Sequence, residues 1–517
     1  MRLSFPVCLS TYSALAEASS APREKEPLPL SEQNKDAERV TPDAGKSGGI
    51  ASSIRQTLKH RMGLDRAVAF AILARCWAAI AGVVSVLLIA RFLSPNEQGY
   101  YYTFYSMVTL TVVFELGFSF VVLQMAAHER AQLKIQWDGT VQGDPVAHSR
   151  LASVLQKSVR WYFVAALLMV TTLTPTGLFF FSANQHVDIL VDWKGPWCLL
   201  AVVAVLDFLL APICGFVEGC GFVPQIAKMR FGQAVLGSTM GWMAMLTHHG
   251  LYAPAMLILG QGLTQVVFLT RPRIRHMLVS LLLRPVGANG VNWREEIWPF
   301  QWRIAVTWLS SYFISQLFNP ILFMFRGPAA AGRMGMSLSI AASIGTVGVA
   351  WMSTKASPFG NFVARGEIRK LNHLFFRTLW QSMALLATGA AGIFLCVLIG
   401  GPRFPRLAMR VLPPWALALL LLTTLMNHVL SSEALYLRAH KKEPFLPQAV
   451  VVALVLAVTT PILAKIGGAN GVTLGYFLFG GLLSLTWGTS IFIASRREWY
   501  GNPRLSGEFA LAGKQES

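Results

Sequence analysis

Charged residues are scarce in this sequence. Asp, Glu, Lys and Arg make up 13% of its 517 residues, whereas hydrophobic residues make up 54%. Soluble domains contain about 25% charged residues, roughly twice the share found here. The apolar residues also form long continuous runs, which differ from the amphipathic spacing of a soluble helix. These features exclude an ordinary soluble protein and predict a membrane protein.

Acidic residues are the scarcer charged class, with 25 Asp and Glu against 44 Lys and Arg, which gives a formal net charge of +19. Such an excess also occurs in proteins that bind nucleic acid. Here, however, the basic residues lie mostly between the hydrophobic runs, and no basic domain is interleaved with aromatic residues. We therefore attribute the positive charge to membrane topology and expect no nucleic-acid partner.

Cysteine is scarce too, and none of the six cysteines belongs to a CxxC pair. Most of them fall within apolar segments, where cysteine packs as a small hydrophobic residue. We expect neither disulfides nor a cysteine metal site. The adjacent His248 and His249 have no carboxylate or cysteine nearby, so no metal site is expected there either. The six cysteines are Cys8, Cys76, Cys198, Cys214, Cys220 and Cys396.

The chain also lacks a recognisable nucleotide-binding segment. The sequence AGKSGG around Lys46 contains a GKS, but no glycine stands five residues before Gly45 and no strand is expected before it. We expect no bound cofactor, so that any energy would come from an H⁺ or Na⁺ gradient or from downstream consumption of the product. Residues 1–62 are rich in Ser, Pro, Glu and Lys, and the sequence predicts a disordered cytoplasmic tail there.

Twelve hydrophobic runs follow this tail, and we predict an all-α polytopic membrane protein with about twelve transmembrane helices. Helices are expected because a backbone inside a bilayer must satisfy its own hydrogen bonds. The fifth run is the weakest, being short and interrupted by glycine. The expected spans lie near residues 67–90, 101–124, 161–181, 197–217, 229–247, 251–270, 304–325, 336–356, 379–399, 415–436, 445–464 and 472–495.

The distribution of Lys and Arg predicts the orientation of these spans. If the N-terminus is cytoplasmic, the cytoplasmic flanks and loops hold 29 of these residues and the outer loops hold 8. Cytoplasmic loops of membrane proteins carry such an excess of positive charge. The pattern supports twelve spans with both termini in the cytoplasm, because an error of one span would destroy the alternation.

Sequence similarities at matching positions divide the chain into two six-helix repeats. A Pro-x-x-x-Gly turn follows the first span of each half, from Pro95 to Gly99 and from Pro328 to Gly332. The sequences FVPQ and FLPQ follow the fourth span of each half. Internal repeats are typical of alternating-access transporters with a central cavity. We expect an N-lobe over residues 63–270, a cytoplasmic linker over 271–303, a C-lobe over 304–495 and a cytoplasmic tail over 496–517.

The first of these turns resembles a motif of the polysaccharide and O-antigen flippases, within the multidrug/oligosaccharidyl-lipid/polysaccharide exporter superfamily. The residues concerned are ARFLSPNEQGY at 90–100, followed by FELGFS at 114–119. The turn of the second half matches less well, because Arg333 and Met334 replace the aromatic residue that usually follows its last glycine. The twelve-span plan over roughly residues 65–495 adds weaker support.

The resemblance implies two six-helix lobes around a central cavity in the cytoplasmic membrane of a bacterium. It implies a substrate too, a lipid-linked oligosaccharide on an isoprenoid pyrophosphate, which would move from the cytoplasmic to the outer leaflet by alternating access. Partners would then be the lipid bilayer, this substrate and other membrane proteins of polysaccharide assembly.

Two charged residues inside the first hairpin are the leading site candidates. Arg75 lies about eight residues into the first span and Glu115 about nine residues from the inner end of the second, so both would lie roughly 12 Å deep. They could form a structural ion pair. Alternatively, Arg75 could face the cavity and bind a pyrophosphate, with Glu115 modulating its charge, because a guanidinium matches phosphate oxygens and stays charged.

A second group of polar residues lies near the middle of the spans. Asp207 in the fourth span and Asn427 and His428 in the tenth are candidates for coupling transport to H⁺ or Na⁺, or for hydrogen bonding between helices.

Further polar residues could contact sugar hydroxyls or join helices. Gln261 and Gln265 share one face of the sixth span, and Gln316 and Asn319 share one face of the seventh. Arg303 and Lys355 lie near inner ends of spans, where they could extend to the interface or receive anionic headgroups.

Two other functions compete with a lipid-linked oligosaccharide flippase. A cation-coupled drug exporter of the same superfamily should have mainly acidic cavity residues, whereas Arg75 favours an anionic substrate. A membrane-embedded glycan polymerase or acyltransferase should have a large outer loop or an intramembrane His/Asp centre, and the predicted outer loops are short. We therefore expect a transporter and no enzyme.

Overall fold

The structure is a computed structural model that describes residues 49–185, 191–286, 290–403, 405–440 and 444–500. The first half of the chain is helical apart from one short hairpin. Its elements are α2 (Gly49–Phe92), α3 (Pro95–Val108), α4 (Thr111–Glu115), α5 (Phe118–Arg130), β1 (Leu133–Ile135), β2 (Val141–Gly143), α6 (Pro145–Ala183), α7 (Lys194–Gly219), α8 (Val223–Leu246), η1 (Gly250–Tyr252) and α9 (Ala253–Leu269).

The second half is helical throughout its described residues and is joined to the first by the linker helix α10. The elements are α10 (Pro272–Leu282), η2 (Trp293–Ile297), α11 (Trp298–Ser315), α12 (Phe318–Arg326), α13 (Pro328–Ser353), α14 (Ala356–Ala364), α15 (Ile368–Gly400), α16 (Pro405–Ala408), α17 (Pro414–Ala439), α18 (Leu446–Gly475), η3 (Tyr476–Leu483) and α19 (Ser484–Tyr500). Below, α2–α9 are called the first half and α11–α19 the second half.

Helical structure extends into both of the segments that were expected to be cytoplasmic tails. Helix α2 begins at Gly49, inside the segment 1–62, and α19 continues to Tyr500, inside the segment 496–517. Residues 1–48 and 501–517 lie outside the described residues, so the expected disorder there stays a prediction.

The second predicted span is broken. Helix α4 ends at Glu115, and α5 begins at Phe118 with its axis bent by 46°. Leu116 and Gly117 between them both have left-handed backbone dihedral angles, with φ of 50° and 68°. Glycine adopts this conformation without a steric cost, whereas leucine does so rarely. The ELG sequence is therefore a helix break, which the sequence had suggested only as a glycine inside an apolar run.

The last two predicted spans form an antiparallel hairpin within one helical segment. Gly468 interrupts α18 with non-helical dihedral angles (φ 58°, ψ −143°). Past this point the chain folds back on itself, as shown by a 2.8 Å hydrogen bond that Gln448 Nε2 donates to the carbonyl of Ser484. Gly480 likewise lies against Leu456. The two arms match the eleventh and twelfth predicted spans.

Length and hydropathy identify the protein as a multi-pass membrane protein. Within the described residues, eight helices are long and apolar enough to cross a membrane, or up to nine if the bent pair around Gly117 is one span. That set counts the folded-back segment from Leu446 to Trp499 as one helix and omits α8 and α11. The all-helical membrane fold is confirmed, and twelve crossings are consistent with it.

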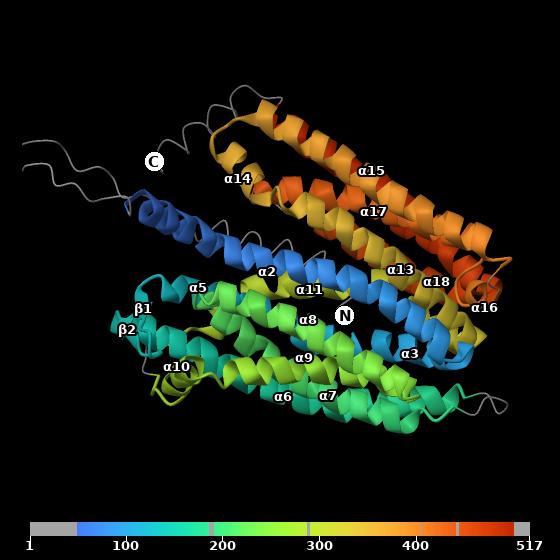
Figure 1. The fold of residues 1–517 in the computed structure, drawn as a ribbon, viewed down its shortest axis with the longest axis horizontal. Helices are drawn as coiled ribbons and strands as arrows, with labels where there is room; N and C mark the ends of the chain where they lie inside the picture. The colour runs from blue at the N-terminus through green and yellow to red at the C-terminus, as the bar shows by residue number, and fades with distance from the viewer. Residues whose placement is uncertain (1–48, 186–190, 287–289, 404, 441–443, 501–517) are drawn as a thin grey trace, which may run out of the picture.

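Figure 1 shows the helices of the two halves running side by side, with α2 along the boundary between them. Helix α2 packs on α8 in the first half and on α13 in the second, and α3 packs on α13. A cluster of buried aromatic residues lies around the start of α3. Tyr100, Phe181 and Phe323 contact one another there, with ring centroids 4.9–5.5 Å apart.

The linker is fastened to the first half by ion pairs. Arg150 on α6 donates to Glu129 at 2.9 Å and to Glu296 in η2 at 2.5 Å. The hairpin β1–β2 lies beside α10, because Gly139 in its turn lies against the backbone of Arg273. These contacts attach α10 and η2 to the first half. Because η2 directly precedes α11, they also fix where α11 begins.

Candidate functional site

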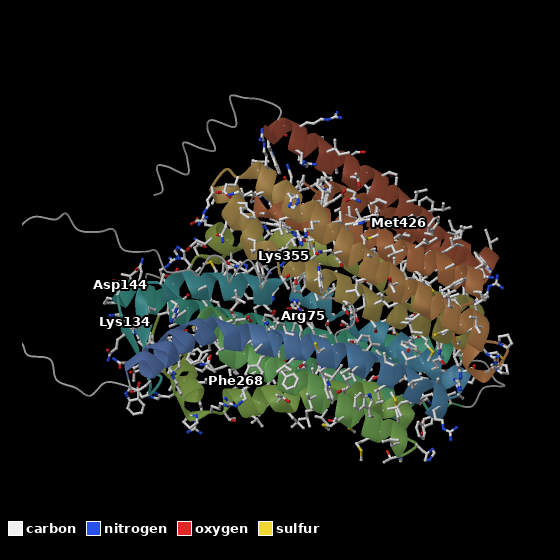
Figure 2. The ribbon with its side chains drawn as sticks, turned by 45° about the horizontal axis from the view of Figure 1, so that its top comes forward. Arg75, Lys134, Asp144, Phe268, Lys355 and Met426 are labelled. Carbon is white, nitrogen blue, oxygen red and sulfur yellow. The ribbon has the colours of Figure 1, made fainter. Side chains whose placement is uncertain are left out.

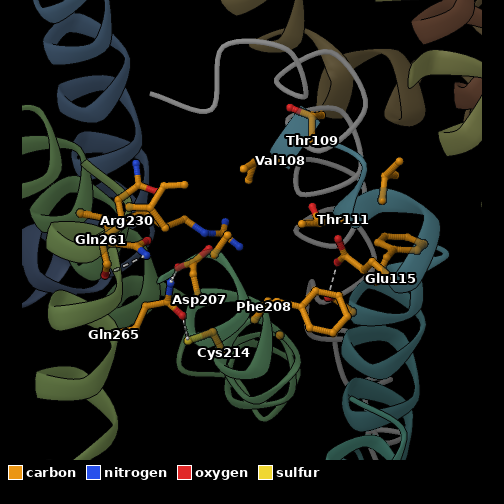
Figure 3. A pocket seen from close by; sticks show the side chains of 18 of the residues that line it. Val108, Thr109, Thr111, Glu115, Asp207, Phe208, Cys214, Arg230, Gln261 and Gln265 are labelled. Atoms are coloured by element: carbon orange, nitrogen blue, oxygen red, sulfur yellow. Dashed lines mark hydrogen bonds between the residues drawn. The ribbon is translucent and has the colours of Figure 1, made fainter. Parts of the chain in front are cut away.

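A polar cavity among the described residues lies in the first half. Its volume is about 220 Å³, and its walls come from α3–α5, α7, α8 and α9, with Trp308 of α11 contributed by the second half. Figure 3 shows Glu115 and Thr111 on one side of this N-half cavity and Asp207, Arg230, Gln261 and Gln265 on the other.

Asp207 is held against α9 by Gln265, a contact that the sequence did not predict. Gln265 Nε2 donates a 2.5 Å hydrogen bond to Asp207 Oδ1, and Gln265 Oε1 accepts a weaker one from Cys214 Sγ at 3.6 Å. Gln265 is buried, and Gln261 one turn earlier lines the same wall. The sequence correctly placed both glutamines on one face, and the structure adds that this face meets Asp207.

Glu115 reaches the cavity because the helix breaks directly after it. Its carboxylate accepts a 2.5 Å hydrogen bond from Ser119 Oγ at the start of α5. The same Ser119 oxygen lies 2.7 Å from the hydroxyl of Tyr162. The side chain of Ile304, from the second half, packs directly against Gly117, so the break is covered by the opposite half.

One end of the cavity contains an ion pair that the sequence did not single out. Arg230 on α8 donates to Glu218 on α7 at 2.5 Å, and the Glu218 side chain is only 8% exposed. Glu218 precedes the FVPQ sequence at residues 222–225 and Arg230 follows it. Opposite charges on either side of this turn are the sequence feature that could have identified the pair. With Glu115 and Asp207, the lining therefore contains three carboxylates and one arginine.

Arg75 is not among the residues that line this cavity. Its Nη1 instead donates a 2.9 Å hydrogen bond to Ser353 Oγ, at the end of α13 in the second half. Lys355 follows two residues later, and Figure 2 labels both basic residues in the region where α2 passes the second half. The predicted pairing of Arg75 with Glu115 stays a prediction, whereas the contact with Ser353 places Arg75 between the halves. No sequence pattern marked Ser353.

Arg303 lies near the start of α11 with its guanidinium 5.7 Å from the ring of Trp302. Both side chains are exposed. This arrangement fits a residue that extends to the membrane interface, which was one of the two expectations for it.

Asn427 and His428 line a separate cavity of about 200 Å³ in the second half. Asn427 Nδ2 donates to the hydroxyl of Tyr476 at 3.2 Å, and His428 Nε2 lies 2.8 Å from Ser382 Oγ. Asp207 lines the N-half cavity, so the three coupling candidates do not form one site. The structure instead gives each half a polar cavity of its own.

A third cavity, of about 70 Å³, lies between the halves and contains Gln316 and Asn319. Asn319 Nδ2 donates a 3.0 Å hydrogen bond to Ser106 Oγ on α3. This central cavity shares Tyr105 and Leu257 with the N-half cavity, and shares Ser315, Leu338 and Ala342 with the C-half cavity. The three cavities therefore adjoin one another across the protein.

Comparison of the sequence with models of protein families finds no match, and no curated protein matches it. Solved structures do match. An inward-facing multidrug resistance transporter of the MATE family has a TM-score of 0.54 and 12% identity, over 83% of this chain and 99% of its own. The lipid II flippase MurJ, in an inward closed conformation, has a TM-score of 0.52 and 11% identity, over 86% and 90%.

A eukaryotic MATE transporter, AtDTX14, gives similar values, with a TM-score of 0.53 and 13% identity over 88% of this chain and 99% of that one. At such low identity these matches describe the fold alone. The chain therefore has the all-helical membrane fold that MATE transporters and the lipid II flippase share.

Proposed function

We propose that this protein is a transporter that moves a lipid with an anionic headgroup across the membrane, namely a lipid-linked oligosaccharide on an isoprenoid pyrophosphate. The observation that carries this proposal is the contact between Arg75 and Ser353, with Lys355 two residues later. The contact joins Arg75 of the first half to the end of α13 in the second half, and Lys355 is two residues further along the chain. A guanidinium and an ammonium in this position suit a pyrophosphate.

The depth of these residues supports a role in substrate entry. Arg75 precedes the end of α2 at Phe92 by 17 residues, which corresponds to about 26 Å of helix. The hydrocarbon core of a bilayer is about 30 Å thick, so Arg75 lies in its cytoplasmic half in the predicted orientation. A headgroup in the inner leaflet would reach Arg75 and Lys355 while its lipid tail stays in the bilayer.

The acidic N-half cavity suits coupling to a cation gradient. Asp207 and Glu115 lie inside it, and carboxylates in membrane spans bind or carry cations. Moving one charge across 100 mV is worth about 2.3 kcal/mol, so H⁺ or Na⁺ entry would bias the direction of lipid movement. In this proposal the protein lies in a bacterial cytoplasmic membrane, with both termini cytoplasmic. It delivers the lipid-linked oligosaccharide to membrane proteins that assemble polysaccharide on the outer side.

The test is a leaflet-resolved assay of the lipid-linked glycan in a deletion strain complemented with variants. Arg75→Ala and Lys355→Ala should leave the lipid-linked glycan in the cytoplasmic leaflet, and Arg75→Lys should retain part of the activity. Arg91→Ala is the matched control, because Arg91 is exposed at the opposite end of the same helix. Normal outer-leaflet glycan in the Arg75→Ala/Lys355→Ala double variant would rule out this entry site.

A cation-coupled exporter is the second candidate, because the N-half cavity holds three carboxylates against one arginine. Such a lining suits a cationic substrate. Purified protein in proteoliposomes distinguishes the two, using a fluorescent lipophilic cation and a short-chain isoprenoid pyrophosphate glycan as separate substrates. Movement of the cation alone, abolished by Asp207→Asn and unaffected by Arg75→Ala, would favour the exporter.

A further inference from the structure

The two copies of the Pro-x-x-x-Gly turn pack directly against each other. The backbone of Gly99 at the start of α3 lies against Pro328 at the start of α13, and a side chain on Gly99 would overlap the Pro328 carbonyl. A side chain on Gly332 would lie 2.9 Å from the nitrogen of Gly99. Small residues allow such close approach of helices within a membrane protein. The repeated motif is thus one contact between the halves.

A buried amide fastens this contact. Gln98 is 1% exposed, and its Nε2 donates to the carbonyl of Gly332 at 2.8 Å and to that of Arg410 at 3.0 Å. Its Oε1 accepts from Nη1 of Arg410 at 3.3 Å. One side chain of the first half therefore holds two separate segments of the second half.

The contact lies at one end of two helices that line the central cavity. Tyr101, Tyr102 and Ser106 on α3 line this cavity, as do Gly335 and other residues of α13. Residues of α2 and of other helices line it too. In the predicted orientation, the end with the Gly99 contact faces outside. Separation of α3 and α13 would open a path from the cavity to that side.

We propose that Gln98, Gly99, Gly332 and Arg410 form an outer latch that keeps the central cavity closed to the outside and opens in each transport cycle. The latch rests on the rocking of two halves that the proposed function requires, but it is independent of the substrate. The latch is held by hydrogen bonds of the Gln98 side-chain amide. Such bonds are directional enough to fix the positions of the two helices and weak enough to break in each cycle. Opening also exposes the half-buried guanidinium of Arg410 at the outer mouth.

Labelling of a reporter cysteine tests the latch without any substrate. In a cysteine-free background, Ala342→Cys places a thiol in the central cavity, and a membrane-impermeant maleimide is added from the outside. Adding Gln98→Ala should raise the labelling rate about tenfold. The hydrogen bonds of Gln98 stabilise only the closed state, so their loss increases the population of the open state. Gly99→Val should raise it further, since its side chain cannot fit against Pro328.

Two controls make the result interpretable. Gln142→Ala removes an exposed glutamine of the β1–β2 hairpin and should leave the rate unchanged. Trp137→Cys, at a position 84% exposed, should react only from the cytoplasmic side in every background. If Gln98→Ala destabilises the protein, Gln98→Met, which keeps the side-chain size and removes these hydrogen bonds, should instead raise labelling of Ala342→Cys. Unchanged labelling in folded Gln98→Ala and Gly99→Val proteins would overturn the latch.

Discussion

The amide of Gln265 donates a 2.5 Å hydrogen bond to the carboxylate of Asp207 and thereby joins α9 to α7 at the wall of the N-half cavity. The bond leaves the acidic side chain anchored beside a space that a cation or water could enter. A change at Asp207 can therefore remove its charge while keeping its hydrogen bond.

Asp207→Asn should uncouple transport from the ion gradient without unfolding the protein. Asparagine retains the oxygen that accepts from Gln265, so the melting temperature should change by no more than about 4 °C, the shift expected from ~1 kcal/mol. Stimulation by an imposed H⁺ or Na⁺ gradient in proteoliposomes should be lost, because no titrating or coordinating carboxylate remains. Full stimulation of the variant by both gradients would exclude Asp207 as a coupling residue.

The Glu218–Arg230 pair should be worth more to stability than an ordinary surface ion pair. Glu218 is 8% exposed and Arg230 is 48% exposed, so removing the arginine leaves a largely buried carboxylate. We expect Arg230→Ala to lower the free energy of unfolding by about 1–3 kcal/mol, a range below that for a fully buried pair. The double variant Arg230→Ala/Glu218→Gln should regain much of the lost free energy of unfolding, because no unpaired carboxylate remains buried. Thermal unfolding in detergent of both single variants and the double variant measures this coupling, and strictly additive losses would contradict it.

Replacing Gly117 should move Glu115. Any other residue at its φ of 68° is strained by about 1–2 kcal/mol, and a methyl group there would also meet Ile304. Gly117→Ala should thus destabilise the protein and reduce transport. Gly262→Ala on α9 is the control, since a methyl group there meets nothing within 4 Å. Equal stability and transport in the two variants would show that the break is dispensable.

Acid should loosen the linker. The hydrogen bond from Arg150 holds the pKa of Glu296 below its usual value of 4.5, so Glu296 stabilises the folded state above that value. This contribution is lost as the pH falls through the lowered pKa. Proteolysis of the linker in inside-out vesicles should therefore accelerate below about pH 4.5, measured with a protease that is active in acid and at neutral pH. Glu296→Gln should be cleaved faster at neutral pH and show less acid dependence.

Residue type and spacing predicted much of this protein. Long apolar runs predicted the helices, whereas the orientation indicated by the basic loops stays a prediction. The repeated Pro-x-x-x-Gly turn predicted corresponding positions in two halves, although not that these positions touch. Gln261 and Gln265 were assigned correctly to one face because helical periodicity is a local property.

The candidate site was predicted less well. Arg75 and Glu115 lie at similar depth on consecutive helices, yet Arg75 contacts Ser353, 278 residues away. Depth along a helix can be read from sequence, whereas the direction of a side chain around its axis depends on the helices packed against it. Leu116 and Gly117 make this harder still, because the break after Glu115 bends α5 by 46° relative to the preceding helical segment.

The sequence by itself determined that the chain is an all-helical membrane protein, because burial of apolar runs and backbone hydrogen bonding leave few alternatives in a bilayer. Only the tertiary structure decided which polar groups meet. Gln98 reaches Arg410, and Asp207 and His428 line different cavities, because such contacts arise from the packing of two halves that are distant in sequence. No local pattern encodes that packing.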